Sequence, residues 1–416
     1  MQQFTLSNGI PVVCDVIPHL RSVSVGIGVR AGSMLESPQE NGLSHYMEHM
    51  AFKGTEKRTS REIAQALDSV GGYLNAATSK LNTVYYARVI DEDLPLAVDV
   101  LCDLVTSPRM DAQDFEKERS VILEEIAMVE DCPEDLIFDV LSEAVFPDQA
   151  LGQAVLGPRE RIEHVTVQDL IAFREKHYGP ANTVISVAGN FDPARLTDLL
   201  EKHIGSWQGG SGCPFPAQTV NPKQTVLCRA KNIEQVHLAL SYTGVPLGDP
   251  RAYDLAILNN IIGSSDSSRL FQRIREELGL VYSVYSAPSA YPGCGEFTLY
   301  AACSPQNTPK VIDALKKEMA ELRANAPAEK EFLSARAQLR GSFLLSLESA
   351  YNRMNAMLAD RMLLGRVVTV EETLRGISAV TPESLMALTE EVLSSAPSSA
   401  VIGRKAARFE QRLQGF

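Results

Sequence analysis

The chain is poor in several residue types, and each shortage argues against a class of protein. Its 416 residues include one tryptophan, seven cysteines and seven histidines. An odd number of cysteines without CxxC spacing does not suit a disulfide framework and predicts reduced thiols in a cytosol. No apolar run reaches the roughly 18 residues that a membrane span requires, so we expect no membrane association.

Basic residues are scarce as well. There are 39 Lys and Arg against 52 Asp and Glu, which gives a net charge of −13 at pH 7. Nucleic-acid-binding proteins usually carry a basic face, so we expect no nucleic-acid partner. The first 16 residues read as a strand and a turn rather than as a targeting peptide. We therefore expect a cytoplasmic bacterial protein, although a mature organellar chain would look the same.

Two of the few histidines stand close together in His45-Tyr46-Met47-Glu48-His49. On a helix, His45 and His49 lie one turn apart on the same face, with Glu48 beside them. Two imidazoles at this spacing can bind one zinc ion, and the carboxylate can take a proton from water that the ion activates. The order H-x-x-E-H is typical of the inverted zincins.

The flanking residues predict a helix seated in a core. Ser37-Pro38-Gln39-Glu40 has the form of a helix N-terminus, and Gly54 supplies a stop. An apolar stripe lies between them, away from the histidines, and consists of Leu43, Met47, Met50 and Ala51.

A catalytic zinc site usually has three protein ligands, so a third is needed. The best source is a helix predicted over residues 111–128, which Asp111 can cap. Its acids include Glu118, Glu124 and Glu125. Glu118 and Glu125 are seven apart and share a face, while Glu124 points about 100° away from Glu125. Spacing alone leaves the choice open, and an acidic, solvated helix face remains an alternative.

The segments GLSHYMEHMAFKGT (42–55) and ERSVILEEI (118–126) together resemble the pitrilysin (insulinase-like) family of zinc peptidases. The chain is most similar to the short-chain branch that includes the mitochondrial processing peptidase β subunit and its bacterial homologues. The resemblance implies one zinc ion per chain, held by His45, His49 and Glu125. It also implies that Glu48 is the general base and that Glu118 supports a ligand. The expected activity is that of a zinc metalloendopeptidase.

Two further segments carry the same resemblance. Residues 71–89 resemble the family's substrate strand, which implies that a peptide adds to this sheet edge beside Asn75 and Ala76. An ordinary core hairpin is the alternative interpretation, because these residues are simply strand formers. Residues 273–286 match a family Arg and Tyr at Arg275 and Tyr282. The implied role of this pair is to hold the substrate carbonyl and stabilise the oxyanion.

The length suits two domains, which we place at residues 1–212 and 213–416, with a linker at 206–224 rich in Gly and Pro. The halves echo one another: segment 22–32 resembles 236–246, and 181–191 resembles 398–404. We therefore expect an α+β fold with two homologous domains, each a mostly antiparallel sheet with helices packed on one face. The second half has AILNNIIG (256–263) where the zinc helix should be. Only the N-terminal domain is expected to bind metal.

Long members of the family enclose substrates in a closed chamber of four such domains, and this chain supplies two. The resemblance therefore implies a homodimer in which Arg275 and Tyr282 complete the zinc site of the opposite subunit. Short or unfolded peptides are the expected substrates. The alternative function is a non-catalytic structural core-type subunit of the same fold, since some relatives have lost the metal.

Overall fold

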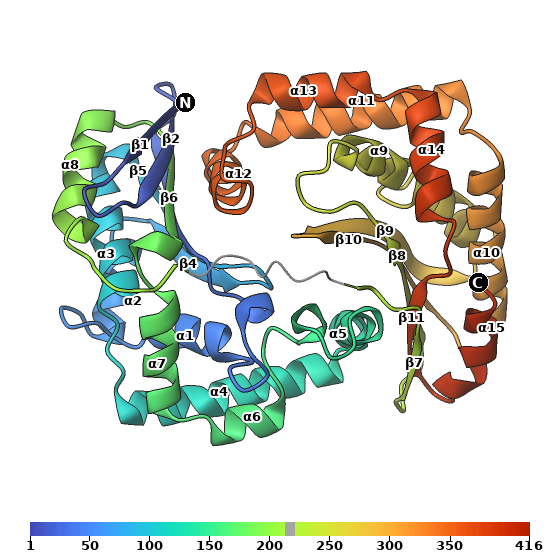
Figure 1. Cartoon of the computed structure of the whole chain (residues 1–416), viewed down its shortest axis with the longest axis horizontal. Coiled ribbons are helices and arrows are strands. Elements are labelled where there is room, and N and C mark those ends of the chain that lie inside the picture. Colours follow the sequence, from blue (N-terminus) through green and yellow to red (C-terminus); the bar gives the residue numbers. More distant parts are fainter. Residues whose placement is uncertain (213–220) are drawn as a thin grey trace. The chain divides into compact units, whose positions relative to one another are not determined.

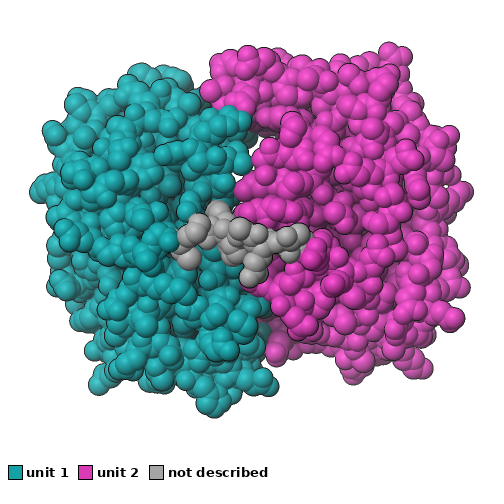
Figure 2. Space-filling model, viewed as in Figure 1, with its two compact units in different colours: residues 1–127, 153–216, 345–368 teal, residues 128–152, 217–344, 369–416 magenta. Residues whose placement is uncertain are grey.

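The computed structural model describes residues 1–212 and 221–416. Within them the chain forms two compact units, coloured separately in Figure 2. The described residues of unit 1 are 1–127, 153–212 and 345–368. Those of unit 2 are 128–152, 221–344 and 369–416.

Unit 1 is built on one mixed sheet (Figure 1). Its strands are β1 (Gln2–Thr5), β2 (Pro11–Val16), β3 (Ser22–Val29), β4 (Tyr73–Thr78), β5 (Thr83–Ile90) and β6 (Thr183–Gly189). Its helices are α1 (Leu43–Ala51), α2 (Ser60–Asp68), α3 (Leu94–Thr106), most of α4 (Ala112–Asp131), α6 (Arg159–His164), α7 (Val167–His177), α8 (Pro193–Ile204) and α12 (Ala350–Leu363). Short helical turns are η1 (Ser33–Leu35), η2 (Asp91–Asp93) and η4 (Pro180–Asn182).

Unit 2 is built on a second sheet. Its strands are β7 (Val226–Ala230), β8 (Val236–Thr243), β9 (Val281–Tyr291), β10 (Cys294–Cys303) and β11 (Ser398–Gly403). Its helices are α5 (Pro133–Val145), α9 (Ala252–Ile262), α10 (Thr308–Ala324), most of α11 (Glu329–Ser346), α13 (Val370–Ala379), α14 (Pro382–Val392) and α15 (Glu410–Gln414). The π-helical turn η5 (Phe271–Glu277) and the short turns η3 (Ala150–Gly152) and η6 (Ala406–Phe409) complete it.

Apart from the additional edge strand β1 in unit 1, the two sheets have the same topology, which confirms the predicted duplication. The strand order is β1-β2-β6-β3-β5-β4 in unit 1 and β7-β11-β8-β10-β9 in unit 2. In each, one parallel pair (β2 with β6, β7 with β11) is followed by antiparallel pairs. The matched segments 22–32 and 236–246 contain the equivalent strands β3 and β8. The edge strands β4 and β9 are therefore equivalent too.

The two units differ from the predicted contiguous domains 1–212 and 213–416. Each unit contains one helix from the other half of the chain: α12 contacts β2, β3 and β6, whereas α5 contacts β8 and β11. The predicted boundary, and the centre of the predicted linker 206–224, fall on residues 213–220, outside the described residues. Helix periodicity predicts an apolar face but not the sheet that this face will cover.

Two glycines on β3 make room for α12. A Cβ at Gly26 would overlap Met354, and one at Gly28 would overlap Met362. Residues alternate between the faces of a strand, so these glycines lie opposite Val25 and Ile27 of the main core. The helices therefore pack mainly on one face of this sheet, as predicted, and α12 adds partial cover to the second face.

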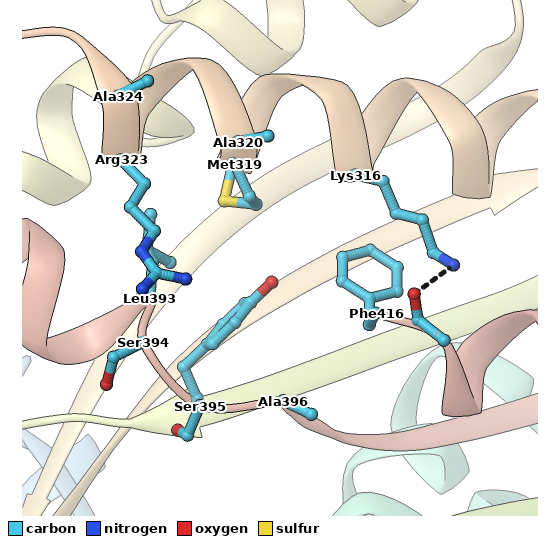
Figure 3. A pocket seen from close by; sticks show the side chains of 12 residues that line it. Lys316, Met319, Ala320, Arg323, Ala324, Leu393, Ser394, Ser395, Ala396 and Phe416 are labelled. Atoms are coloured by element: carbon cyan, nitrogen blue, oxygen red, sulfur yellow. Dashed lines mark hydrogen bonds between the residues drawn. The ribbon is translucent and has the colours of Figure 1, made fainter.

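In unit 2, α10 holds the last residues of the chain. Lys316 Nζ donates to the backbone carbonyls of Arg412 at 2.7 Å and Gly415 at 2.8 Å. Figure 3 shows the second of these bonds. Lys316 lines a cavity with a volume of about 610 Å³, and Arg323, two turns further along α10, lines the same cavity.

None of the helices in the described residues is long and apolar enough to cross a membrane.

Candidate metal centre

The predicted zinc helix exists, but it begins later than predicted. Helix α1 starts at Leu43, after Gly42, which has a left-handed backbone with φ 96°. The Ser37–Glu40 pair instead closes a turn, in which the Ser37 backbone N–H donates to the Glu40 carboxylate at 3.0 Å. This bond is one half of the capping box that the sequence indicated, and no helix begins at Ser37.

The residue that caps α1 is Glu36, which the sequence analysis missed. Its buried carboxylate accepts hydrogen bonds from the backbone N–H groups of Gly42 at 2.8 Å and Ser44 at 2.7 Å, and from the Asn41 side chain at 3.0 Å. A carboxylate at a helix N-terminus satisfies unpaired N–H groups and complements the helix dipole. Burial raises the pKa of Glu36, which these hydrogen bonds oppose.

Helix α4 carries the predicted third ligand. Asp111 accepts from the backbone N–H groups of Gln113 and Asp114, as expected of a cap. The helix is fixed to α1 by Tyr46, whose hydroxyl donates to the Phe115 carbonyl at 2.6 Å and whose ring stacks on that of Phe115 at 4.5 Å. This buried contact sets the distance between the histidines on α1 and the acids on α4.

The structure brings His45, His49 and Glu125 together. Glu125 Oε2 lies 3.6 Å from His45 Nε2 and 3.4 Å from His49 Nε2. Two ligand atoms of a tetrahedral zinc site are about 3.3–3.5 Å apart, given metal–ligand distances of about 2.0–2.2 Å. The three side chains therefore fit a zinc ion, and they form the one such cluster in the described part of the chain. Glu124 is exposed and points elsewhere.

Both histidines are prepared for metal binding. Burial, with a smaller contribution from the charge of His49, lowers the pKa of His45 to about 3. A neutral imidazole is the form that binds metal, so His45 is ready to do so at neutral pH. On the side away from the cluster, His49 Nδ1 lies 3.0 Å from a Glu118 oxygen. That contact favours the tautomer with a free Nε2 lone pair.

Glu48 lies beside the cluster and is held by β4. The Thr78 hydroxyl donates a hydrogen bond to Glu48 Oε2. Burial raises the pKa of Glu48, although the Thr78 hydrogen bond and the electrostatic interaction with His49 act in the opposite direction. A carboxylate with a raised pKa is a better proton acceptor near neutral pH, which suits a general base.

Glu118 is joined to a cation as well as to a ligand. Lys53 Nζ lies 2.7 Å from Glu118 Oε1, while the other oxygen faces His49. The Glu118 side chain is only 6% exposed. A buried carboxylate without its cation would be costly, so Lys53 helps to keep Glu118 in place.

We expect Lys53→Met to weaken zinc binding about tenfold, because changes to groups that support a ligand typically cost 10–100-fold in affinity. Lys53→Arg should retain most of the affinity. Chelator competition measures the effect, and Lys117→Met is the matched control, since Lys117 forms an exposed 3.2 Å ion pair with Asp114 on the same helix. Equal zinc affinity in Lys53→Met and Lys117→Met would contradict this role.

The predicted substrate strand lies at a sheet edge. Among the strands of the described residues, β4 pairs only with β5 and ends the sheet of unit 1. The Ala76 backbone N–H donates to Asn75 Oδ1 at 2.9 Å, and Asn75 Nδ2 donates to the Tyr73 hydroxyl at 2.8 Å. The Asn75 side chain thus shields an edge N–H group, and a strand that pairs there must displace it.

Arg275 and Tyr282 belong to unit 2, in η5 and β9. The Arg275 guanidinium lies 4.6 Å from the ring centroid of Phe271 and 5.9 Å from that of Tyr282. Tyr282 is 73% exposed. The structure therefore brings this pair together, within a unit whose described residues contain no metal-ligand cluster.

Comparison with known proteins is consistent with this geometry. Residues 12–159 match the family model described as insulinase (peptidase family M16), and residues 164–339 match the peptidase M16 inactive domain. The "uncharacterized zinc protease YmxG" of Bacillus subtilis is 37% identical over 97% of this chain and 98% of its own length. An "uncharacterized zinc protease" of Streptomyces coelicolor is also 37% identical, over 97% of this chain and 89% of its own.

Solved structures share the fold. A protease from Helicobacter pylori superposes with a TM-score of 0.89 at 19% identity, over 97% of this chain and 99% of its own. A Pseudomonas fluorescens protein titled peptidase M16 inactive domain has a TM-score of 0.90 at 20% identity, over 97% of this chain and 98% of its own. With the two family models and the full-length relatives, the conclusion is that this chain belongs to the insulinase family of zinc peptidases, peptidase family M16.

Proposed function

We propose that the protein is a zinc metalloendopeptidase that cleaves short or unfolded peptides. The observation that carries the proposal is the cluster of His45, His49 and Glu125, with the buried carboxylate of Glu48 next to it. Relatives of nearly equal length named zinc proteases support it. One ion per chain is expected, because the described residues offer one suitable cluster.

Each group at the candidate site has its own role in the proposed hydrolysis. When bound, zinc supplies a Lewis acid that polarises the scissile carbonyl and lowers the pKa of water. Glu48 accepts a proton from the attacking water and later gives a proton to the leaving amine nitrogen. Thr78 holds Glu48 Oε2, so the other oxygen is left to exchange protons. Glu118 and Lys53 keep His49 in the orientation that ligation requires.

The substrate is proposed to lie along the free edge of β4. An extended peptide there would gain main-chain hydrogen bonds from the strand, including the Ala76 N–H once the Asn75 side chain moves aside. Folded proteins cannot offer an extended segment of this kind, and for this reason the substrate must be short or unfolded. Thr78 joins the same strand to Glu48, which brings the peptide edge close to the general base.

We further propose that the working form is a homodimer that encloses its substrate in a chamber. In this arrangement Arg275 and Tyr282 of one subunit stabilise the oxyanion at the zinc site of the other. The exposed Tyr282 ring and the adjacent Arg275 guanidinium support an intermolecular role, because their groups are available for contact.

The proposal is tested with purified protein by measuring bound zinc, the mass of the assembly and the hydrolysis of a quenched-fluorescent unstructured peptide. We expect one zinc ion per chain, a dimeric mass and cleavage that a chelator abolishes. A monomeric mass with full activity would contradict the dimer. No zinc after reconstitution, with no cleavage, would favour the structural-subunit function instead.

A further inference from the structure

A second cavity lies in unit 1, away from the zinc ligands. It has a volume of about 450 Å³ and is lined by β3, β5, β4 and the start of α12. Ser24, Arg88 and Tyr73 form a row across three neighbouring strands, since Arg88 pairs with Ser24 on one side and with Tyr73 on the other. Tyr351 lines the cavity from α12. We call this cavity the arginine pocket.

Arg88 lies close to two aromatic rings. Its guanidinium carbon lies 4.9 Å from the ring centroid of Tyr73 and 5.4 Å from that of Tyr351. A guanidinium that contacts aromatic rings still has N–H groups that can donate hydrogen bonds. Within the described residues Arg88 forms no ion pair, although acids outnumber bases in this chain. A fixed guanidinium with free N–H groups suits a carboxylate.

The start of α12 adds a second feature that favours an anion. Ser349 caps this 14-residue helix, and Ser349, Ala350 and Tyr351 all line the pocket. The Ser349 side chain accepts from the Asn352 N–H. The first N–H groups of a helix have no acceptor within it, and the helix dipole favours negative charge at this end. The pocket therefore combines a cationic side chain with the positive end of a helix.

Of the described residues that line the pocket, Glu348 is the one acid. Its side chain is exposed, and within the described residues it makes no ion pair with Arg88. It does not neutralise the guanidinium directly, but its charge opposes the entry of another anion. Removing that charge should consequently strengthen anion binding.

The pocket lies on the path proposed for the substrate. Thr78 at one end of β4 contacts Glu48, and Tyr73 at the other end contacts Arg88. These two positions are five residues apart, which corresponds to about 17 Å along a strand. An odd separation also places the two side chains on opposite faces of the sheet. A peptide paired with β4 could thus present one side chain to the arginine pocket while a bond near Thr78 is cleaved.

We propose that the arginine pocket binds a carboxylate of the peptide substrate, about five residues from the scissile bond. The carboxylate belongs to an acidic side chain or to the peptide's C-terminus. This inference rests on the proposed peptidase function and adds a substrate preference to it. The net charge of −13 repels acidic peptides in general, so the preference is confined to one position of the substrate.

The test compares cleavage of quenched-fluorescent peptides that carry a single Glu or Gln at successive positions on either side of the scissile bond. Glu at one position about five residues away should raise kcat/KM about tenfold over Gln, mainly through KM, because ground state and transition state gain the same contact. If the C-terminal carboxylate is the ligand, the gain appears when the peptide ends there and disappears on amidation.

Variants assign the effect to the pocket. Arg88→Gln should reduce the Glu-to-Gln ratio of kcat/KM to about one, and Glu348→Gln should raise it. Arg323→Gln is the matched control: it removes the same charge from the cavity in unit 2 (Figure 3), and the ratio should not change. An equal ratio in the wild type and Arg88→Gln, or no preference for Glu at any position, would overturn the proposal.

Binding separates this inference from the peptidase function. Fluorescence anisotropy of the labelled Glu and Gln peptides is measured on Glu48→Gln protein with and without Arg88→Gln. If the wild type cleaves no peptide but the Glu peptide binds more tightly in an Arg88-dependent manner, the peptidase function fails and the pocket stands. If peptides are cleaved and Arg88 has no effect on either measurement, the pocket fails and the peptidase function stands.

Discussion

Glu48→Gln is expected to reduce kcat by about 10²–10⁴-fold, the range over which a positioned general base acts. Glutamine has the same shape and can still accept the Thr78 hydrogen bond through its amide oxygen. It cannot accept the proton of the attacking water. Because Glu48 is not one of the three clustered ligands, bound zinc should remain at the wild-type level. Hydrolysis of an unstructured peptide and metal analysis on the same sample measure both quantities.

A matched acid-to-amide change separates the loss of this base from a general loss of charge. Glu56→Gln alters an exposed carboxylate that follows the same helix, and its kcat should stay near that of the wild type. Wild-type turnover in Glu48→Gln would show that another group accepts the proton. Loss of zinc from that variant would mean instead that Glu48 helps to hold the metal.

The duplicated fold could be predicted because similar strand segments recur in the two halves of the sequence. Segments 22–32 and 236–246 repeat a strand at similar spacing, and they occupy equivalent positions in the two sheets. The exchange of α5 and α12 could not be predicted in the same way, since an apolar stripe does not specify its partner. One signal was available: Gly26 and Gly28 lie on the same face of β3. Because this face lacks side chains at both positions, a helix can pack close to the strand there.

The metal centre was predictable in its local part only. Spacing on one helix places His45 and His49 together, whatever the fold. The choice of Glu125 needed a resemblance to a known family, because it depends on how α4 packs against α1. That packing is set by Tyr46 and Phe115, a contact between residues 69 apart in the chain. Lys53 and Thr78 were missed for the same reason, because each acts through a partner distant in the sequence.

The start of α1 was predicted wrongly because the prediction relied on Ser37–Glu40 and did not consider Gly42, which lies between this segment and the helix. Ser37 and Glu40 do form one half of a capping box, in which the Ser37 backbone N–H donates to the Glu40 carboxylate at 3.0 Å. Gly42, however, adopts a left-handed conformation, which interrupts a helix. Glu36 then supplies the acceptor for the new N-terminus from outside the helix. Sequence rules for helix N-termini do not include a capping carboxylate six residues before the N–H group that it binds.

Glu125→Gln is expected to weaken zinc binding by at least about 10²-fold, beyond the typical effect of changing a group that merely supports a ligand. An amide carries no charge to offset that of the ion, and the remaining pair of His45 and His49 leaves the site incomplete. Glu124→Gln is the neighbouring control, because its side chain is exposed on another side of α4 and should leave zinc affinity unchanged.

Chelator competition on the two variants decides between adjacent carboxylates that spacing alone could not separate. Peptide hydrolysis should follow the metal, falling in Glu125→Gln at low zinc and recovering in part when zinc is raised, because Glu48 and Thr78 are still in place. Recovery of this kind distinguishes the loss of a metal ligand from the loss of the general base, because added zinc should not restore hydrolysis in Glu48→Gln. A fall in zinc affinity in Glu124→Gln and not in Glu125→Gln would show that a different face of α4 points toward α1. The contact of Glu118 with His49 would then be wrong as well.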